Sequence, residues 1–163
     1  MSAYTLFVTR QRPSPADAVR DCACFNLRKA ARAVTQLYEE ALAPSGVLAT
    51  QFSILVALAV ADGAPLSRVA EGLVMDRTTL TRNLRPLARR GWVRIEVGED
   101  RRARTLGLTR SGRAALERAL PLWQQAQTRL QEQLGGARWA RMRTDLQSLV
   151  TTVQKDATAG GHG

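Results

Sequence analysis

Hydrophobic residues recur at helical spacing along most of this chain and alternate as in a strand only near its middle. After Asp76, a good helix N-cap, the leucines Leu80, Leu84 and Leu87 fall on one face of a helix. Gly91 follows the last of these turns, and glycine commonly ends a helix there. The pattern therefore predicts a helix that buries its leucines and turns its polar side chains to solvent.

Two short segments after this helix alternate between apolar and polar residues. Residues 92–97 indicate one strand and residues 105–108 a second, and residues 98–103 supply an arginine-rich turn between them. An apolar segment that begins at Leu66 predicts a shorter helix before Asp76. Two consecutive helices followed by a basic hairpin are the elements of a winged helix-turn-helix.

The polar face of the second helix carries arginine and threonine and little negative charge. Guanidinium groups and hydroxyls donate hydrogen bonds to phosphates and to base edges in the major groove of duplex DNA. We therefore expect this face and the hairpin to bind duplex DNA. The candidate DNA-binding residues are Arg77, Thr78, Thr79, Thr81, Arg82, Arg85, Arg101, Arg102 and Arg104.

The charge of the chain also supports DNA binding. The formal net charge is +10, and 22 of the 24 basic residues are arginine, which binds phosphate through two parallel hydrogen bonds. Residues 68–113 hold 12 arginines against five acidic residues. Charge alone would also fit a protein that does not bind DNA and whose arginine-rich surface is simply solvated, with arginine frequent because of codon bias. The charge, the capped helix and the hairpin together favour DNA binding over a merely solvated surface.

Long helices with apolar seams lie on both sides of the winged helix. In the first helix, Leu27 and Val34 belong to a seam with three- and four-residue steps, and a similar seam runs through Leu116 and Trp123. A winged helix does not need these helices for its own core, so we expect them to form a homodimer. The alternative is a bundle in which they fold back on the same chain.

The length and the order of these elements predict one mainly α-helical domain with a small β-hairpin. Thr50 and Thr109 are the expected N-caps of the helices that follow them. The expected parts are a flexible N-terminal arm at 1–15, a single domain at 16–156 with its winged helix at about 48–108 and dimerisation helices at about 16–43 and 109–156, and a disordered tail at 157–163.

Several classes of protein are not expected. No apolar run approaches the length that spans a bilayer, and the first residues lack the ordered regions of a signal peptide, so we expect a cytoplasmic protein without a membrane partner. The chain lacks an internal histidine, a phosphate-binding glycine loop and a spaced acidic cluster, so neither an enzyme nor a cofactor is expected. Two thiols and one tail histidine cannot complete a zinc site within one chain.

The order and spacing of these elements resemble the MarR family of bacterial transcriptional regulators over roughly residues 22–153. The most specific motif is in the wing, an Asp, any residue and an Arg, then Leu-Thr at the next helix, here Asp100, Arg102, Leu108 and Thr109. The resemblance implies a homodimer with recognition helices in adjacent major grooves and wing arginines in the minor groove. It also implies that Arg102 is the residue at the wing tip.

A narrower segment resembles the organic-peroxide sensors of the same family. There the resemblance implies Cys24 as the reactive thiol and Tyr38 as its hydrogen-bond partner, although Arg28 and Ala49 stand where two further tyrosines would support the thiol. Cys22 and Cys24 are two positions apart on the expected helix, so a disulfide between them is not expected. Redox-active thiols and inert, packed thiols both stay open. The matching residues are Cys24, Phe25, Leu27, Ala30, Arg32, Thr35 and Tyr38.

The combined expectation is a sequence-specific transcriptional regulator, a repressor that a signal releases, acting as a homodimer on a pseudo-palindromic operator. By analogy with the family, the signal is a small aromatic or acidic effector, with Arg28, Arg32 and Trp123 as candidate pocket residues. The alternatives are a thiol-based redox regulator through Cys24 and a non-specific architectural DNA-binding protein.

Overall fold

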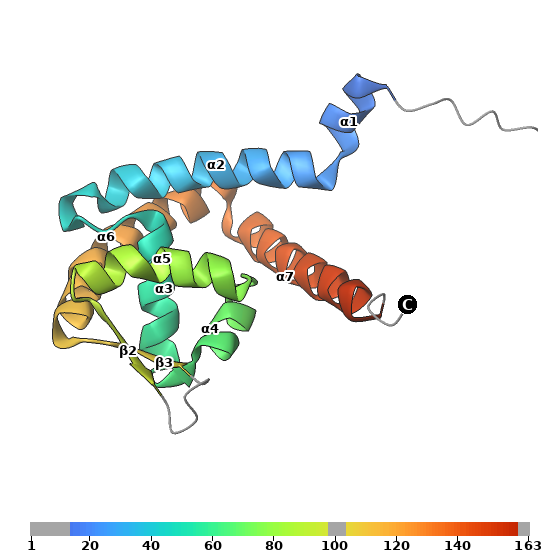
Figure 1. Cartoon of the computed structure of the whole chain (residues 1–163). Helices are drawn as coiled ribbons and strands as arrows, with labels where there is room; N and C mark the ends of the chain where they lie inside the picture. Colours follow the sequence, from blue (N-terminus) through green and yellow to red (C-terminus); the bar gives the residue numbers. More distant parts are fainter. Residues whose placement is uncertain (1–13, 98–103, 160–163) are drawn as a thin grey trace, which may run out of the picture. The chain divides into compact units, whose positions relative to one another are not determined.

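The computed structural model describes residues 14–97 and 104–159, which are mostly helical with one small sheet (Figure 1). The expected fold class, a mainly α-helical winged helix, is confirmed. The chain forms two compact units, Met1–Leu37 and Tyr38–Gly163. The elements in chain order are α1 (Pro15–Asp21), α2 (Ala23–Leu42), the short 3-10 helix η1 (Ala43–Ser45), α3 (Ala49–Val60), β1 (Ala64–Pro65), α4 (Leu66–Gly72), α5 (Arg77–Arg89), β2 (Val93–Val97), β3 (Arg104–Leu108), α6 (Arg110–Leu134) and α7 (Gly136–Ala159).

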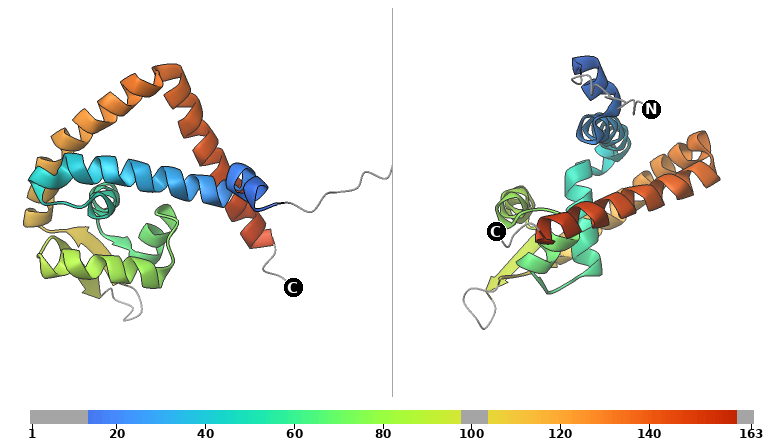
Figure 2. Two further views of the ribbon diagram at one scale, coloured as in Figure 1. Left: turned by 90° about the horizontal axis from the view of Figure 1, so that it is seen from above. Right: turned by 90° about the vertical axis from the view of Figure 1, so that its right-hand side faces the viewer.

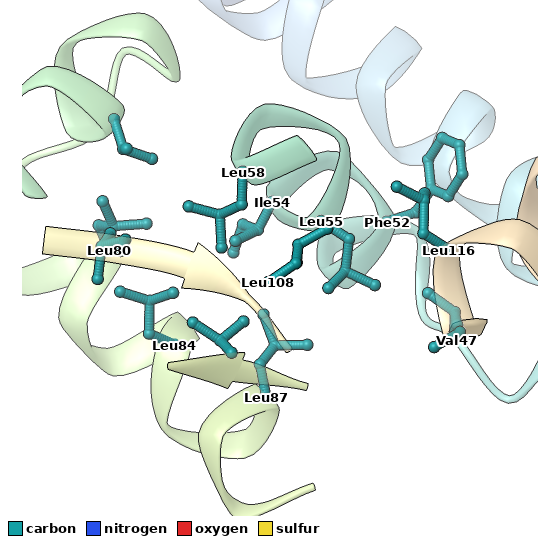
Figure 3. Close-up of a cluster of buried hydrophobic side chains, with 14 of the residues drawn as sticks. Val47, Phe52, Ile54, Leu55, Leu58, Leu80, Leu84, Leu87, Leu108 and Leu116 are labelled. Carbon is teal, nitrogen blue, oxygen red and sulfur yellow. The ribbon is translucent and has the colours of Figure 1, made fainter. Parts of the chain in front are cut away.

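The core of the second unit lies between α3, α5 and the sheet (Figure 3). Leu84 of α5 and Leu55 of α3 are fully buried, as is Leu58 one turn later, and Leu108 of β3 is 1% exposed. The spacing of these leucines puts them on one face of each helix, and burying that face stabilises the unit by the hydrophobic effect. The predicted apolar face of α5 is therefore confirmed.

The sheet has three antiparallel strands in the order β1-β3-β2. The hairpin strands pair from Val93 with Leu108 to Val97 with Arg104, close to the predicted strands. The two-residue strand β1 adds to the other edge of β3, where Ala64 pairs with Leu106. We did not predict β1, because two residues are too short to show an alternating pattern. The turn at 98–103 lies outside the described residues.

Three helix starts were predicted from capping residues, and two are confirmed. The Asp76 carboxylate accepts a hydrogen bond from the N–H of Thr79, and the Thr109 hydroxyl accepts one from the N–H of Gly112. The prediction for Thr50 was wrong, because α3 begins at Ala49 and Thr50 lies in its first turn.

The first dimerisation segment was predicted as one long helix from about Pro15 to Leu42, and this was wrong, because α1 and α2 are separated at Cys22. The Asn26 side-chain amide donates to the backbone carbonyls of Val19, Arg20 and Cys22 at 3.3, 3.0 and 3.0 Å. Val19 and Arg20 lie in the last turn of α1, whose carbonyls have no partner within the helix, so the bonds to these two carbonyls let the chain turn there at little cost. The spacing of hydrophobic residues contains no information about such a polar contact, so it could not predict the break.

Helix α6 continues through Pro121 and ends at Gly135, whose φ of +81° lies in the left-handed region. Figure 2 shows α6 and α7 leaving this turn in different directions. Of the expected terminal segments, residues 1–13 and 160–163 lie outside the described parts of the chain, and α7 continues to Ala159. The domain boundaries therefore stay predictions.

Candidate nucleic-acid interface

Helix α5 exposes its polar face to solvent because its apolar face is buried in the core. Leu80, Leu84 and Leu87 are fully buried, and Asp76 holds the start of the helix through the N–H and the hydroxyl of Thr79, at 2.7 and 2.6 Å. These two hydrogen bonds lower the pKa of Asp76 below its ordinary value. The orientation of the polar face thus follows from the burial of the leucines and from the cap.

A groove of about 420 Å³ runs between this polar face and the first residue of β3. No acidic side chain lines it, and none of its arginines takes part in an ion pair among the described residues. Free guanidinium groups beside hydroxyls suit phosphate and base-edge recognition. Its lining consists of Leu66, Arg77, Thr78, Thr81, Arg82, Arg85 and Arg104, and we call it the arginine groove.

The arginine groove brings together six of the nine residues that the sequence predicted for DNA binding. Thr79 does not line it, because its hydroxyl donates to the Asp76 carboxylate and its side chain is half-buried. Arg101 and Arg102 lie outside the described residues, so their role at the wing stays a prediction. The sequence analysis missed Leu66, since only the packing of α4 against α5 brings this leucine to the groove.

The two cysteines lie in the first unit, and their redox role stays a prediction. Cys22 and Cys24 are both free and exposed. Cys22 lies between α1 and α2, not on one helix with Cys24 as we had assumed. The Tyr38 hydroxyl donates to Gln127 Oε1, and a phenol has only one proton to donate. Burial raises the pKa of this hydroxyl, and a role for Tyr38 beside a thiol stays a prediction.

The candidate effector residues lie in different units. Arg28 and Arg32 are exposed on α2 in the first unit. Trp123 belongs to the second unit, where its ring stacks on Phe52 with the ring centroids 5.8 Å apart. Nearby along α6, Gln127 is buried, and its Nε2 has no hydrogen-bond partner among the described residues. The effector pocket stays a prediction.

The described parts of the chain offer neither a cluster of metal ligands nor a single membrane-spanning helix. No group of three or more His, Cys, Asp or Glu side chains there could hold a metal ion. No single helix there is long and apolar enough to cross a membrane, and α2 to α3 reach that composition only together, as a bent pair. Within that pair, α3 carries core residues such as Leu55.

Comparisons with known proteins agree with this geometry. A model of the MarR family matches residues 45–103, from the end of η1 into the wing. YwoH, an uncharacterised HTH-type transcriptional regulator of Bacillus subtilis (strain 168), is 28% identical over 91 residues. The match covers 56% of this chain and 66% of YwoH, so the chain spans just under two thirds of that relative's length.

Two solved structures extend the similarity over most of the chain. The M. tuberculosis transcriptional regulator MosR, crystallised with DNA, is 40% identical, with 83% of this chain and 98% of that chain covered and a TM-score of 0.77. CouR, a transcriptional repressor bound to a 23-mer DNA duplex, is 28% identical, with 88% and 99% covered and a TM-score of 0.68. The chain therefore belongs to the MarR family of winged helix-turn-helix transcriptional regulators.

Proposed function

We propose that the protein is a sequence-specific repressor that binds duplex DNA as a homodimer. The observation that carries this proposal is the arginine groove, where four arginines without an ion pair to any described residue meet two threonines, and no acidic side chain belongs to its lining. MosR and CouR, which share its fold and are 40% and 28% identical, have structures in complex with DNA. In this proposal α5 enters the major groove, and Arg104 at the start of β3 contacts the adjacent phosphates.

The homodimer is proposed from apolar surface that the chain leaves exposed. On α7, Leu146, Leu149 and Val153 share one face and are 43%, 37% and 59% exposed. On α2, Leu27 and Val34 are 38% and 40% exposed. Exposed apolar side chains that share one face of a helix are candidates for an interface. A two-fold dimer presents two α5 helices, which fit half-sites about 10–10.5 base pairs apart.

The first test separates base reading from phosphate binding. Genomic fragments bound by the wild-type protein are selected, and affinities are then measured for a selected site and for random duplex. Arg82→Ala should weaken the selected site more than random DNA, because a lost bidentate base contact costs about 1–3 kcal/mol. Arg129→Ala, on the exposed side of α6, is the matched control and should change neither affinity.

Arg102→Ala, in the wing, should instead weaken both DNAs and flatten the dependence of log affinity on log salt. If random duplex competes for the protein as well as the selected duplex does, that result would favour the architectural, non-specific alternative. An equal loss for Arg82→Ala on both DNAs would assign Arg82 to the phosphate backbone.

The second test concerns the dimer on its operator. An insertion of about five base pairs between the half-sites turns one of them to the opposite side of the duplex. If two α5 helices bind together, affinity should fall towards that of a single half-site. Unchanged affinity after the insertion would contradict the paired binding mode.

For the releasing signal, we propose a small aromatic acid that binds beside Trp123 and Gln127. The support is the buried amide of Gln127, whose Nε2 lacks a partner that a carboxylate or phenol oxygen could supply. Benzoate and 4-hydroxybenzoate are suitable probes, with tryptophan fluorescence and operator release as the readouts. Gln127→Leu should abolish both responses, while release that persists in this variant would place the effector elsewhere.

A thiol switch is the second candidate, favoured by the exposure of both cysteines. The Cys24 thiolate would attack a peroxide oxygen, the O–O bond would break, and sulfur would lose two electrons to give a sulfenic acid and an alcohol or water. Peroxide should then release the wild-type protein from DNA, a thiol reductant should restore binding, and Cys24→Ser should not respond. Cys22→Ser should lose only a later disulfide step. No release of the wild-type protein by peroxide would end this candidate.

A further inference from the structure

An ionic cluster holds the base of the β2–β3 hairpin. Arg94 Nη2 lies 3.3 Å from Asp62 Oδ1, and Arg113 Nη2 lies 2.6 Å from Asp62 Oδ2. Each carboxylate oxygen of Asp62 thus forms an ion pair with a different arginine. The three residues come from separate elements, since Asp62 follows α3, Arg94 belongs to β2 and Arg113 lies in the first turn of α6.

Arg94 reaches Asp62 by crossing the central strand β3. It pairs in register with Gly107, and its Nη1 donates to the carbonyl of Leu108 at 2.7 Å. A Cβ placed on Gly107 would lie 2.6 Å from Arg94 Cζ and 2.6 Å from Asp62 Oδ1. The guanidinium therefore occupies the space where any other residue would carry its side chain. Glu96 completes the arrangement, because its Oε1 lies 3.1 Å from Arg94 Nε.

The same strand carries a residue of the arginine groove. β3 begins at Arg104, which lines the groove, and ends at Leu108, next to the cap of α6. Leu106 and Leu108 are buried, so alternation along the strand puts Gly107 on the opposite face. The core holds one face of β3, and Arg94 and Asp62 hold the other. None of the cluster residues lines the groove itself.

We propose that Asp62, Arg94 and Gly107 form a clasp that positions β3, so that Arg104 meets DNA together with the arginines of α5. Arg113 ties this clasp to α6, which continues from the cap at Thr109. Asp62 and Arg94 are positioning residues in this proposal and do not themselves contact DNA. The inference rests on the proposed DNA binding and adds the residues that hold the hairpin in place for it.

The sign of the effect of Asp62→Asn on affinity tests the clasp. This variant removes a negative charge near a DNA-binding surface, so electrostatics alone predicts tighter binding. A positioning role predicts the opposite, a loss of about fivefold or more on a selected operator duplex. Glu117→Gln is the matched control, because Glu117 is an exposed acid on α6 outside the ion pairs of the described residues. It should leave affinity unchanged or slightly raise it.

Gly107→Ala opens the same clasp without changing charge. Its added Cβ must displace Arg94 or Asp62, so operator affinity should fall as in Asp62→Asn. The decisive measurement is a double-mutant cycle with Arg104→Ala. If the clasp acts through Arg104, either clasp substitution should cost much less affinity when Arg104 is already absent. Equal costs in the two backgrounds, or tighter binding by Asp62→Asn, would overturn the proposal.

Hydrogen exchange keeps the clasp testable apart from DNA binding. In Asp62→Asn, the amides of β3 and of the first turn of α6 should exchange faster than in the wild type and in Glu117→Gln, while those of α5 should not change. Unchanged exchange in β3 would overturn the clasp even if DNA binding is found. Faster exchange in a protein that binds no duplex would leave the clasp as a hairpin support and would refute the proposed function and the DNA-binding role of the clasp.

Discussion

Helices α5 and α7 carry the same three- and four-residue spacing of apolar side chains, and they use it differently. On α5, Leu80, Leu84 and Leu87 are fully buried in the core of their own chain. On α7, Leu149 is 37% exposed and Val153 is 59% exposed. The periodicity thus indicates that a helix has an apolar face, but it does not say which surface covers that face.

The difference separates two kinds of stability. The face of α5 is buried in the core of its own chain, where β2 and α4 are its neighbours, so it should stabilise the fold of a single chain. Within the second unit the face of α7 is left exposed, so its apolar area is available to stabilise an assembly such as the proposed homodimer. Substitutions in the two helices should therefore differ in kind as well as in size.

The largest expected effect is on the core. Leu84→Ala should lower the free energy of unfolding by about 2–5 kcal/mol, because it removes buried methyl groups and leaves a cavity. Denaturant unfolding at low protein concentration measures it. Leu149→Ala is the partner measurement and should cost under about 1 kcal/mol in the same conditions. Similar losses in the two variants would remove the distinction between the helices.

The next effect tests the face of α7 directly. Leu149→Glu puts a charge into the proposed interface and should shift the protein to monomers in sedimentation, with helical circular dichroism retained. Operator affinity should fall by about 100-fold, because two linked half-sites lose their mutual high effective concentration. Gln147→Glu makes the same charge change on an exposed α7 residue and should leave the assembly intact. A Leu149→Glu protein that sediments like the wild type would exclude this face from the dimer.

A smaller effect concerns the cap that starts α5. Asp76→Ala removes two hydrogen bonds to Thr79, and the Tm should fall by about 2–4 °C at neutral pH. The folded state lowers the pKa of Asp76 from its ordinary value of 3.8, so the stabilisation is present at and above that value. It should disappear as the pH falls through the lower folded-state pKa. A difference in Tm that persists unchanged at lower pH would contradict this assignment.

The smallest effect is a gain. Val74, in the turn between α4 and α5, has a φ of +52°, a left-handed conformation that a β-branched residue adopts only with strain. Its side chain is 58% exposed, so little packing would be lost on its removal. Val74→Gly should raise the free energy of unfolding by about 0.5–1 kcal/mol, since relief of strain exceeds the added entropy of the unfolded chain. An unchanged or lower Tm would contradict the strain.

Local chemistry made part of the interface predictable. Asp76 and Thr109 each cap a helix by accepting a hydrogen bond from the backbone N–H three positions later. Such a cap depends on only a few consecutive residues, so the sequence can predict it. The leucines of α5 are buried as predicted, and Arg77 and Arg82 on the other face line the groove. Thr79 also lay close to the polar face, but its hydroxyl bonds to Asp76, and a residue pattern cannot tell a capping threonine from a groove threonine.

The sequence by itself determined the order of the helices, the hairpin strands and the basic character of the polar face, because each depends on periodicity, capping or composition within a few residues. The tertiary structure decided what depends on residues far apart in the chain. It brought Arg104 beside α5, added β1 to the sheet and placed Arg94 across Gly107 onto Asp62. Such contacts are set by how strands pair and helices pack, and no local pattern encodes them.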